Sequence, residues 1–335
     1  MNLERKGMST YLQRKKLIKR GTPLDIRPVG DGHKNRVFRV SANTDQWIIK
    51  QALSRVQHVK ERWWVDRKRV FTESHCIEIL NQIVPPDVIP QVVLEDRTDF
   101  ILITTPPPRD SVWWESELQR GRIDLQIAVQ CGELLATVHN ATFRRPDLRS
   151  SFKDTKTFEQ LRIGPYYQAI AEAFPDLAKI ITSQAQELLK QKQALVLADL
   201  RPRNVWIDTG QVYLVDFATA HFGNPSFDLA FYSADLCLRA MLNSLQKAAY
   251  LEAINVFWNG YLRIAEYPGK QEVEKTAVRD LGCLLLSATD GRQPVEGMPV
   301  EIINLSRRIA QSLLFTELEH IEDITEFINR TLIDG

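Results

Sequence analysis

The segment 195–216 restricts what this chain can fold into more than any other part of it. Its sequence is LVLADLRPRNVWIDTGQVYLVD. An apolar run at 195–197 leads into a polar loop, and two short β-like runs follow at 205–207 and 212–215, joined by the turn Asp-Thr-Gly. A strand, a tight turn and a second strand predict a β-hairpin. The sequence therefore predicts a rigid hairpin with polar side chains at its entrance and at its end.

Those polar side chains match the needs of phosphoryl transfer. Asp199 and Asn204 precede the hairpin, and Asp216 ends its second strand. The reaction needs a carboxylate for the acceptor hydroxyl and two ligands that hold Mg²⁺ on the phosphates. We predict Asp199 as the catalytic carboxylate, and Asn204 and Asp216 as the metal ligands. Ordinary turn chemistry is the alternative, since Asp and Asn favour loops, but the complete pattern favours catalysis.

The same segment resembles the aminoglycoside phosphotransferase and choline kinase superfamily, whose usual form is H-G-D-L-H-P-G-N followed by D-F or D-P-E. Downstream, the sequence GNPSFDLA at 223–230 is similar to the G-D-P-x-x-D-L-A of that superfamily. Two positions differ, because Leu197 and Arg201 replace its two histidines. In the similar D-L-K-P-E-N of protein kinases the lysine lies by the transferred phosphate, so we expect Arg201 to contact the γ-phosphate.

Composition describes an ordinary globular protein. The chain has 335 residues, of which 25% are charged and 44% hydrophobic, and a net charge of +1; this length is sufficient for two lobes. Nothing in the charge indicates nucleic acid or a membrane surface, and no apolar run approaches a membrane span or a signal peptide. The four cysteines are scattered, which is typical of small buried residues in a reducing compartment. We expect a cytoplasmic protein with neither nucleic acid nor membrane as partner.

The residues before Thr22 are basic, and we treat 1–21 as a segment of its own. Its basic residues are Arg5, Lys6, Arg14, Lys15, Lys16, Lys19 and Arg20. Apolar residues such as Tyr11 and Leu12 are mixed among them, a pattern more typical of a solvated amphipathic helix than of a nucleic-acid-binding arm.

Two glycines, Gly30 and Gly32, form a predicted tight turn before an alternating run that predicts a strand. Glycines let backbone N–H groups approach phosphate oxygens closely, although a plain hairpin turn would have the same sequence. The next predicted strand, 47–50, ends at Lys50. In kinases a lysine at this place pairs with the α- and β-phosphates of ATP and with a glutamate of the next helix.

That helix is predicted at 67–81, where apolar residues recur at helical spacing. Glu73 lies on its apolar face, so we predict Glu73, rather than Glu78, as the partner of Lys50. The part of the chain from the glycine turn to Glu73 resembles the N-lobe of methylthioribose kinase. By that resemblance, the inserted loop 54–66, with its two tryptophans, is a candidate nucleotide lid.

The lobes are predicted to divide at a run of prolines. Two predicted strands, 92–94 and 100–103, are followed by Thr-Thr-Pro-Pro-Pro, which suits a hinge as well as a plain linker. We place the small nucleotide-binding lobe at 22–105 and the larger lobe at 106–335. Helices of the larger lobe are predicted at 123–139, up to residue 193, and starting near Phe227, Leu245, Glu272 and Val300.

Two residues of the larger lobe are given structural roles. His139 lies at the end of a predicted helix, where a histidine is more often hydrogen-bonded than catalytic. Asp228, in the segment that resembles G-D-P-x-x-D-L-A, is expected to anchor the backbone of the catalytic loop.

The resemblance implies an α+β, two-lobe, protein-kinase-like fold that uses ATP and Mg²⁺. The acceptor would be a hydroxyl of a sugar, an aminoglycoside or an amino alcohol, and the small lobe favours a methylthioribose-like sugar. One alternative is a nucleotide-binding pseudokinase, which Leu197 supports. Another is a protein kinase, which the short connection 218–226 and the lack of an A-P-E-like segment oppose. The oligomeric state is left open.

Overall fold

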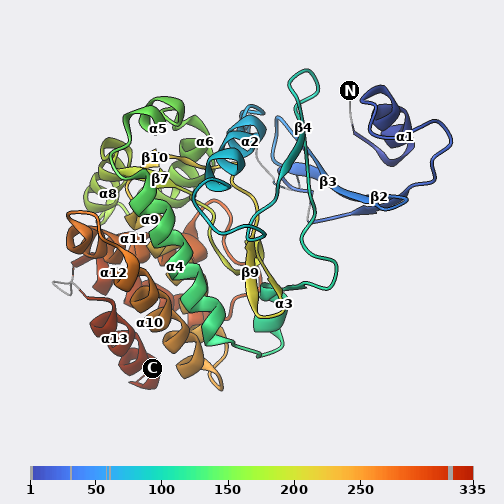
Figure 1. Cartoon of the computed structure of the whole chain (residues 1–335). Coiled ribbons are helices and arrows are strands. Elements are labelled where there is room, and N and C mark those ends of the chain that lie inside the picture. The colour runs from blue at the N-terminus through green and yellow to red at the C-terminus, as the bar shows by residue number, and fades with distance from the viewer. Residues whose placement is uncertain (1–2, 31, 58, 60–61, 316–319, 335) are drawn as a thin grey trace. The chain divides into compact units, whose positions relative to one another are not determined.

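The computed structural model describes residues 3–30, 32–57, 59, 62–315 and 320–334 (Figure 1). The chain divides into two compact units. The first comprises Met1–Asp110 and Val215–Ala218, and the second comprises Ser111–Leu214 and Thr219–Gly335. The segment before residue 22 and the short piece that carries Asp216 therefore both belong to the first unit.

The first unit is built on a five-stranded antiparallel sheet in the order β1-β2-β3-β5-β4. Its strands are β1 (Asp25–Pro28), β2 (Asn35–Ala42), β3 (Asp45–Ala52), β4 (Val92–Asp96) and β5 (Ile101–Thr104). Helix α2 (Arg69–Leu80) packs against β3, β4 and β5. Val70, Ile77 and Leu80 are buried, which confirms the apolar face predicted from their spacing.

The N-terminal segment forms helix α1 (Arg5–Arg14), which completes the core of the first unit. Tyr11 and Leu12 belong to one buried apolar cluster with side chains of β2, β3 and β5. Tyr11 Oη donates to Asp96 Oδ2 at 3.1 Å, and Lys15 Nζ lies 2.7 Å from the same oxygen. The prediction of a solvated helix is therefore wrong. The helix is amphipathic, but its apolar face is core, because one face of the sheet lies against it.

Leu12→Ala should destabilise the first unit by about 2–5 kcal/mol, since it opens a cavity in a packed core. Native-state hydrogen exchange at the amides of β2 and β3 measures this loss. Leu245→Ala is the matched control, because Leu245 is 96% exposed, and it should leave those amides unchanged. Equal exchange in both variants would show that α1 adds nothing to the core.

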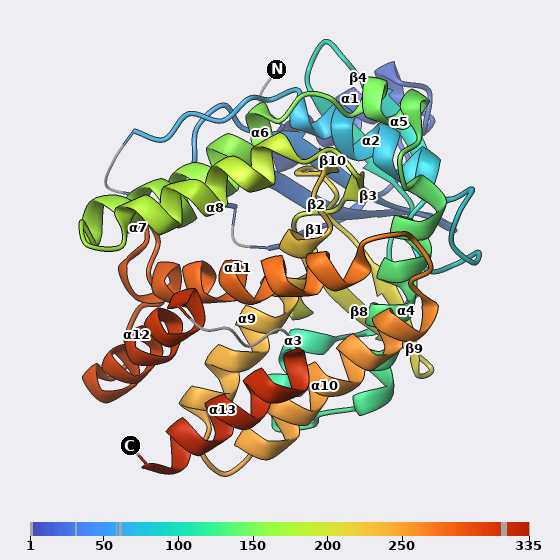
Figure 2. The ribbon, with the colours of Figure 1, turned by 90° about the vertical axis from the view of Figure 1, so that its left-hand side faces the viewer.

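The second unit is mainly helical (Figure 2). Its α-helices are α3 (Trp114–Gln119), α4 (Leu125–Thr142), α5 (Pro146–Ser151), α6 (Lys156–Phe158), α7 (Ala169–Ala173), α8 (Ala178–Lys190), α9 (Ser226–Leu242), α10 (Lys247–Ile264), α11 (Lys270–Asp290), α12 (Val300–Phe315) and α13 (Ile321–Asp334). Helix α4 packs against α10, and α11 packs against α9 and α12. Gly132 permits the close approach of α4 to α10, because a Cβ there would lie 2.1 Å from the carbonyl oxygen of Phe257.

Its strands are short: β6 (Val112–Trp113), β7 (Ala194–Val196), β8 (Val205–Asp208), β9 (Gln211–Leu214) and β10 (His221–Gly223). Strands β8 and β9 form the predicted hairpin. Its turn residues Thr209 and Gly210 have φ of 47° and 81°, as expected for a two-residue hairpin turn.

A π-helix, Glu159–Gln168, was not predicted. The four cysteines are buried and free, as expected, and no helix in the described ranges is long and apolar enough to span a membrane.

A buried carboxylate joins four helical elements of the second unit. Asp280 of α11 accepts hydrogen bonds from Tyr167 Oη at 2.9 Å, Gln184 Nε2 at 3.0 Å and Ser226 Oγ at 2.9 Å. It is 0% exposed. Burial raises the pKa of Asp280 to about 7, although the three donors lower it. The folded state therefore holds this proton more tightly than the unfolded chain does.

The second unit should consequently lose stability as the pH rises. Protonation of Asp280 favours the folded state. Its contribution to stability is complete below the ordinary carboxyl pKa and is lost as the pH passes through about 7. We expect the free energy of unfolding to fall by about 2–3 kcal/mol from pH 5 to pH 8. Urea unfolding of wild type and Asp280→Asn tests this, because Asn keeps an acceptor for Tyr167 and a donor for Ser226.

Asp280→Asn should remove that fall. Asp176→Asn, a change at an exposed aspartate of the same unit, should retain it. If the free energy of unfolding of Asp280→Asn fell by the same amount as that of wild type, another group would be responsible for the pH dependence.

Candidate active site

The first unit contains a partly buried group of one lysine and two carboxylates. Lys50 Nζ, on β3, lies 2.6 Å from Glu73 Oε1 of α2 and 3.2 Å from Asp216 Oδ1. The pair of Lys50 and Glu73 is the one predicted from the helical face. Burial lowers the pKa of Lys50, but Asp216 and Glu73 outweigh it and leave the pKa above its usual value. The ammonium is therefore permanently charged at neutral pH.

The two carboxylates of this group differ in their surroundings. Glu73 is buried, and burial raises its pKa against the opposing charge of Lys50. Its Oε2 is buried without a hydrogen-bond partner among the described residues. The side chain of Asp216 is 32% exposed. Asp216 has a φ of 67°, a left-handed conformation that is uncommon for a residue other than glycine and is frequent at functional sites.

The glycine turn of the first unit has the predicted backbone. Gly30 and Gly32 have φ of 78° and 72°, and a Cβ added to either would meet nothing within 4 Å. Only glycine adopts this conformation without strain. Between them, Asp31 lies outside the described residues. Arg69 of α2 donates from its guanidinium to the carbonyl oxygen of Lys34, just beyond the turn, and so ties α2 to it.

The inserted loop 54–66 closes on itself. The N–H of Val56 donates to the carbonyl oxygen of Trp63 at 2.9 Å, and the N–H of Val65 donates to that of Ser54 at 2.9 Å. His58, Lys60 and Glu61 of the proposed lid lie outside the described residues. Of its two tryptophans, Trp63 is 5% exposed and Trp64 is 60% exposed.

The second unit places a carboxylate between two guanidinium groups. Asp199 Oδ1 lies 2.8 Å from Arg162 Nη2 and 3.0 Å from Arg201 Nε. Asn204 Nδ2 donates to the backbone carbonyl oxygen of Asp199 at 2.8 Å. Arg201 carries its charge at any physiological pH: burial lowers its pKa, but Asp199 and other groups hold it above the ordinary value. The predicted residues Asp199, Arg201 and Asn204 therefore meet in one loop.

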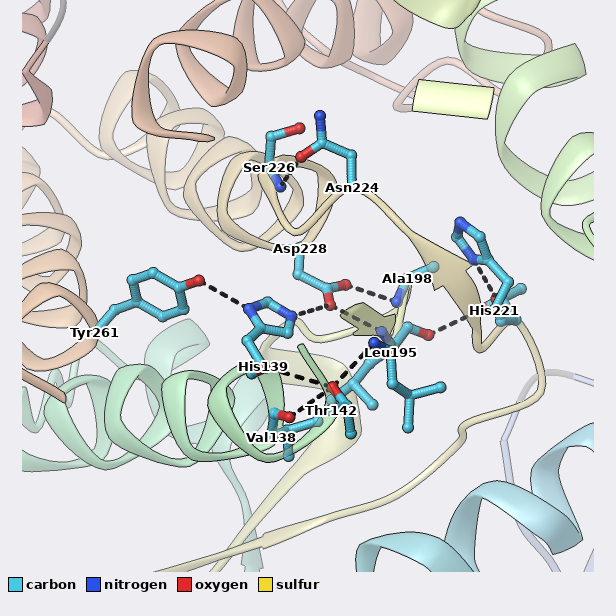
Figure 3. Close-up of polar contacts among 12 residues, drawn as sticks. Val138, His139, Thr142, Leu195, Ala198, His221, Asn224, Ser226, Asp228 and Tyr261 are labelled. Carbon is cyan, nitrogen blue, oxygen red and sulfur yellow. Dashed lines mark hydrogen bonds and ion pairs between the residues drawn. The ribbon is translucent and has the colours of Figure 1, made fainter. Parts of the chain in front are cut away.

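Asp228 holds the backbone of that loop (Figure 3). Its two carboxylate oxygens accept the N–H groups of Leu197 at 2.8 Å and Ala198 at 2.6 Å. His139 Nε2 lies 3.3 Å from Asp228 Oδ2, and His139 Nδ1 lies 2.8 Å from Tyr261 Oη. The structural roles predicted for Asp228 and His139 are thus confirmed. Ala198 has a φ of 57°, so the loop is bent sharply just before Asp199.

Sequence reasoning missed Arg162 and Arg69. Arg162 is 0% exposed and lies in the π-helix, in a segment to which no chemistry was assigned. An arginine between Leu161 and Ile163, close to two tyrosines, was the available signal.

Within the described residues, no group of three or more His, Cys, Asp or Glu side chains is placed to hold a metal ion. A metal site would therefore need other ligands, such as Asn204.

Asp228→Asn should loosen the catalytic loop. One carboxylate oxygen becomes an NH₂ group that faces a backbone N–H, and leaving a buried donor unpaired costs about 1–3 kcal/mol. Hydrogen exchange at the amides of Leu197 and Ala198 should accelerate by about tenfold or more. Tyr261→Phe is the control, because it removes a bond to His139 and touches neither amide. Unchanged exchange at both amides in Asp228→Asn would contradict the anchoring role.

A small sheet-rich unit and a larger helical unit, with these two groups of charged residues, define a kinase-like phosphotransferase. Residues 25–267 match the family model described as "Phosphotransferase enzyme family". The chain belongs to this family. It is a phosphotransferase that acts on a hydroxyl group.

Curated relatives include two methylthioribose kinases. The enzyme of Geobacillus kaustophilus (strain HTA426) is 24% identical over an alignment of 299 residues, gaps included, that covers 80% of this chain and 74% of that protein. The enzyme of Bacillus thuringiensis subsp. konkukian (strain 97-27) is 25% identical over an alignment of 329 residues, gaps included, that covers 84% of this chain and 82% of that protein.

Solved structures share the fold at low identity. Amicoumacin kinase, in complex with AMP-PNP, Ca²⁺ and Ami, has a TM-score of 0.60 at 12% identity and covers 97% of this chain and 100% of its own. A choline/ethanolamine kinase family protein from Mesorhizobium loti has a TM-score of 0.51 at 14% identity and covers 98% of this chain and 100% of its own. The predicted two-lobe kinase-like fold is confirmed.

Proposed function

We propose that this phosphotransferase moves the γ-phosphoryl group of ATP, with Mg²⁺, to a hydroxyl of a small neutral sugar of the methylthioribose type. The partly buried group of Lys50, Glu73 and Asp216 is the observation that supports the reaction most. A lysine kept charged by two carboxylates is suited to bind a polyphosphate, because the carboxylates fix its position and its charge together.

The residues of the first unit fit a nucleotide. Lys50 would bind the α- and β-phosphates, and Glu73 would hold Lys50 in place. Gly30 and Gly32 would cover the phosphates, since nothing lies within 4 Å of an added Cβ at either and their backbone N–H groups suit anions. The 32% exposure of the Asp216 side chain leaves this carboxylate accessible to a cation.

Asn204 and Asp216 would hold Mg²⁺. When bound, the metal would neutralise charge on the phosphates. The amide nitrogen of Asn204 donates to the carbonyl oxygen of Asp199, so its amide oxygen would be the metal ligand. Asp199 would orient the acceptor hydroxyl and accept its proton. Arg201, whose side chain is 19% exposed, would stabilise charge on the transferred group.

The charges beside Arg201 favour a neutral acceptor. Arg239 Nε lies 2.6 Å from Asp235 Oδ1, both on α9, and Arg239 Nη2 lies 3.2 Å from Glu115 Oε1 of α3. Asp235 and Glu115 also act electrostatically on Arg201. The three carboxylates Asp199, Asp235 and Glu115 are therefore balanced by three arginines. These are Arg162, Arg201 and Arg239. A polycationic aminoglycoside would need an excess of acidic groups, whereas a sugar hydroxyl binds to balanced donors and acceptors. The methylthioribose kinases among the relatives agree with this choice.

The test is Mg·ATP-dependent ADP release with methylthioribose, other sugars, aminoglycosides, choline and homoserine. We expect turnover with methylthioribose or a similar sugar, abolished in Asp199→Asn. Asp216→Asn should lose about 10²-fold or more in kcat, because metal neutralisation of the phosphates is a large electrostatic contribution. Asp208→Asn, at the end of β8, is the control and should stay within about twofold.

Normal turnover by Asp216→Asn would contradict the metal role. Turnover only with aminoglycosides or choline would contradict the neutral acceptor. If no compound reacts, the melting temperature decides between two explanations: a rise with Mg·ATP shows that the acceptor was not in the panel, and no rise contradicts the proposed nucleotide site.

A further inference from the structure

We propose that Arg162 is the positioning residue of the catalytic carboxylate, a role that rests on the function proposed above for Asp199. Its guanidinium makes one ion pair and two hydrogen bonds. Nη2 lies 2.8 Å from Asp199 Oδ1, Nε donates to the carbonyl oxygen of Ala198 at 2.7 Å, and Nη1 donates to that of Leu161 at 2.9 Å. One rigid planar group thus fixes the carboxylate and the backbone that carries it.

Arg162 cannot act on a substrate directly. Its side chain is 0% exposed, whereas that of Arg201 is 19% exposed. Both lie within ion-pair distance of the same oxygen, Asp199 Oδ1. The two arginines therefore have different roles: Arg201 has a surface that a ligand can reach, and Arg162 acts only through Asp199.

The guanidinium of Arg162 is itself held in place. Its Cζ lies 4.9 Å from the ring centroid of Phe231 and 5.7 Å from that of Tyr166. The first ring belongs to α9 and the second to the π-helix that carries Arg162. Cation–π contacts of this kind stabilise a buried guanidinium, and π-helical turns are frequent at functional sites. The carboxylate is therefore held by a guanidinium that is itself packed against two neighbouring aromatic rings.

Arg162 complements Asp228 at the strained residue before Asp199. Asp228 accepts the N–H of Ala198 at 2.6 Å, and Arg162 donates to its carbonyl oxygen at 2.7 Å. Both polar groups of a residue with a φ of 57° are thus paired with charged side chains. The apolar side chain of Leu197 makes none of these bonds. Leu197 is bound to Asp228 through its backbone N–H. Positioning of this accuracy matters, because a misplacement of about 1 Å can cost about 10²-fold in rate.

The experiment measures steady-state kinetics of Arg162→Met, Arg162→Lys and Arg162→Ala with the acceptor found in the panel. We expect kcat to fall about 10²-fold in Arg162→Met and less in Arg162→Lys, while KM for Mg·ATP stays within about twofold. Added guanidinium ion should restore part of kcat to Arg162→Ala and none to Asp199→Asn. Tyr167→Phe is the matched control, because it alters the same π-helix without touching Asp199; it should keep kcat.

Crystal structures of wild type and Arg162→Met provide a readout that does not need turnover. The Asp199 carboxylate should lie elsewhere or be disordered in the variant. A carboxylate in the same place, or an unchanged kcat in folded Arg162→Met, would overturn the inference. If wild type turns over no compound of the panel, the melting temperature with Mg·ATP tests the proposed function, and the position of the carboxylate still decides the role of Arg162.

Discussion

The second unit depends on one buried carboxylate. Asp228 is 0% exposed, and a buried charge is tolerated only where hydrogen bonds replace the lost water. Two backbone N–H groups of the loop and one imidazole nitrogen supply these bonds. Asp228 lies in the first turn of α9, where the helix dipole also favours an anion. The first turn of α9 therefore sets the path of the chain between Leu197 and Asp199.

The first unit also contains a charge that has lost most of its hydration, in this case a positive one. Lys50 is almost enclosed, with a side chain 12% exposed, and two carboxylates offset the loss of hydration. One of them, Asp216, reaches the unit from 166 residues away along the chain. Because 215–218 packs with the first unit, the lysine and its two partners form one group whose geometry is fixed within that unit.

Local patterns in the sequence predicted the elements that depend on local rules. The hairpin β8–β9 followed from alternation and a turn that needs positive φ, and the pair of Lys50 and Glu73 followed from a helical face. Arg162 could not be found this way, because its bond to Ala198 spans 36 residues and no periodicity links a π-helix to a loop. The left-handed φ of Ala198 was equally invisible, because alanine does not favour that conformation, and that of Asp216 was not predicted although aspartate adopts it more often than most residues. Tertiary contacts, rather than propensity, impose both.

Leu197 is the main argument for a chain that has lost its activity, and the energetics of the site oppose it. The side chain of Leu197 is buried, but the loop uses its N–H rather than its side chain. Around it the structure maintains two costly features: left-handed backbone at Ala198, and two arginines on one carboxylate oxygen. Strain costs about 1–3 kcal/mol for each such residue. Strained residues of this kind cluster at functional sites, and the replacement of one side chain at Leu197 leaves this backbone and the charged groups beside it in place.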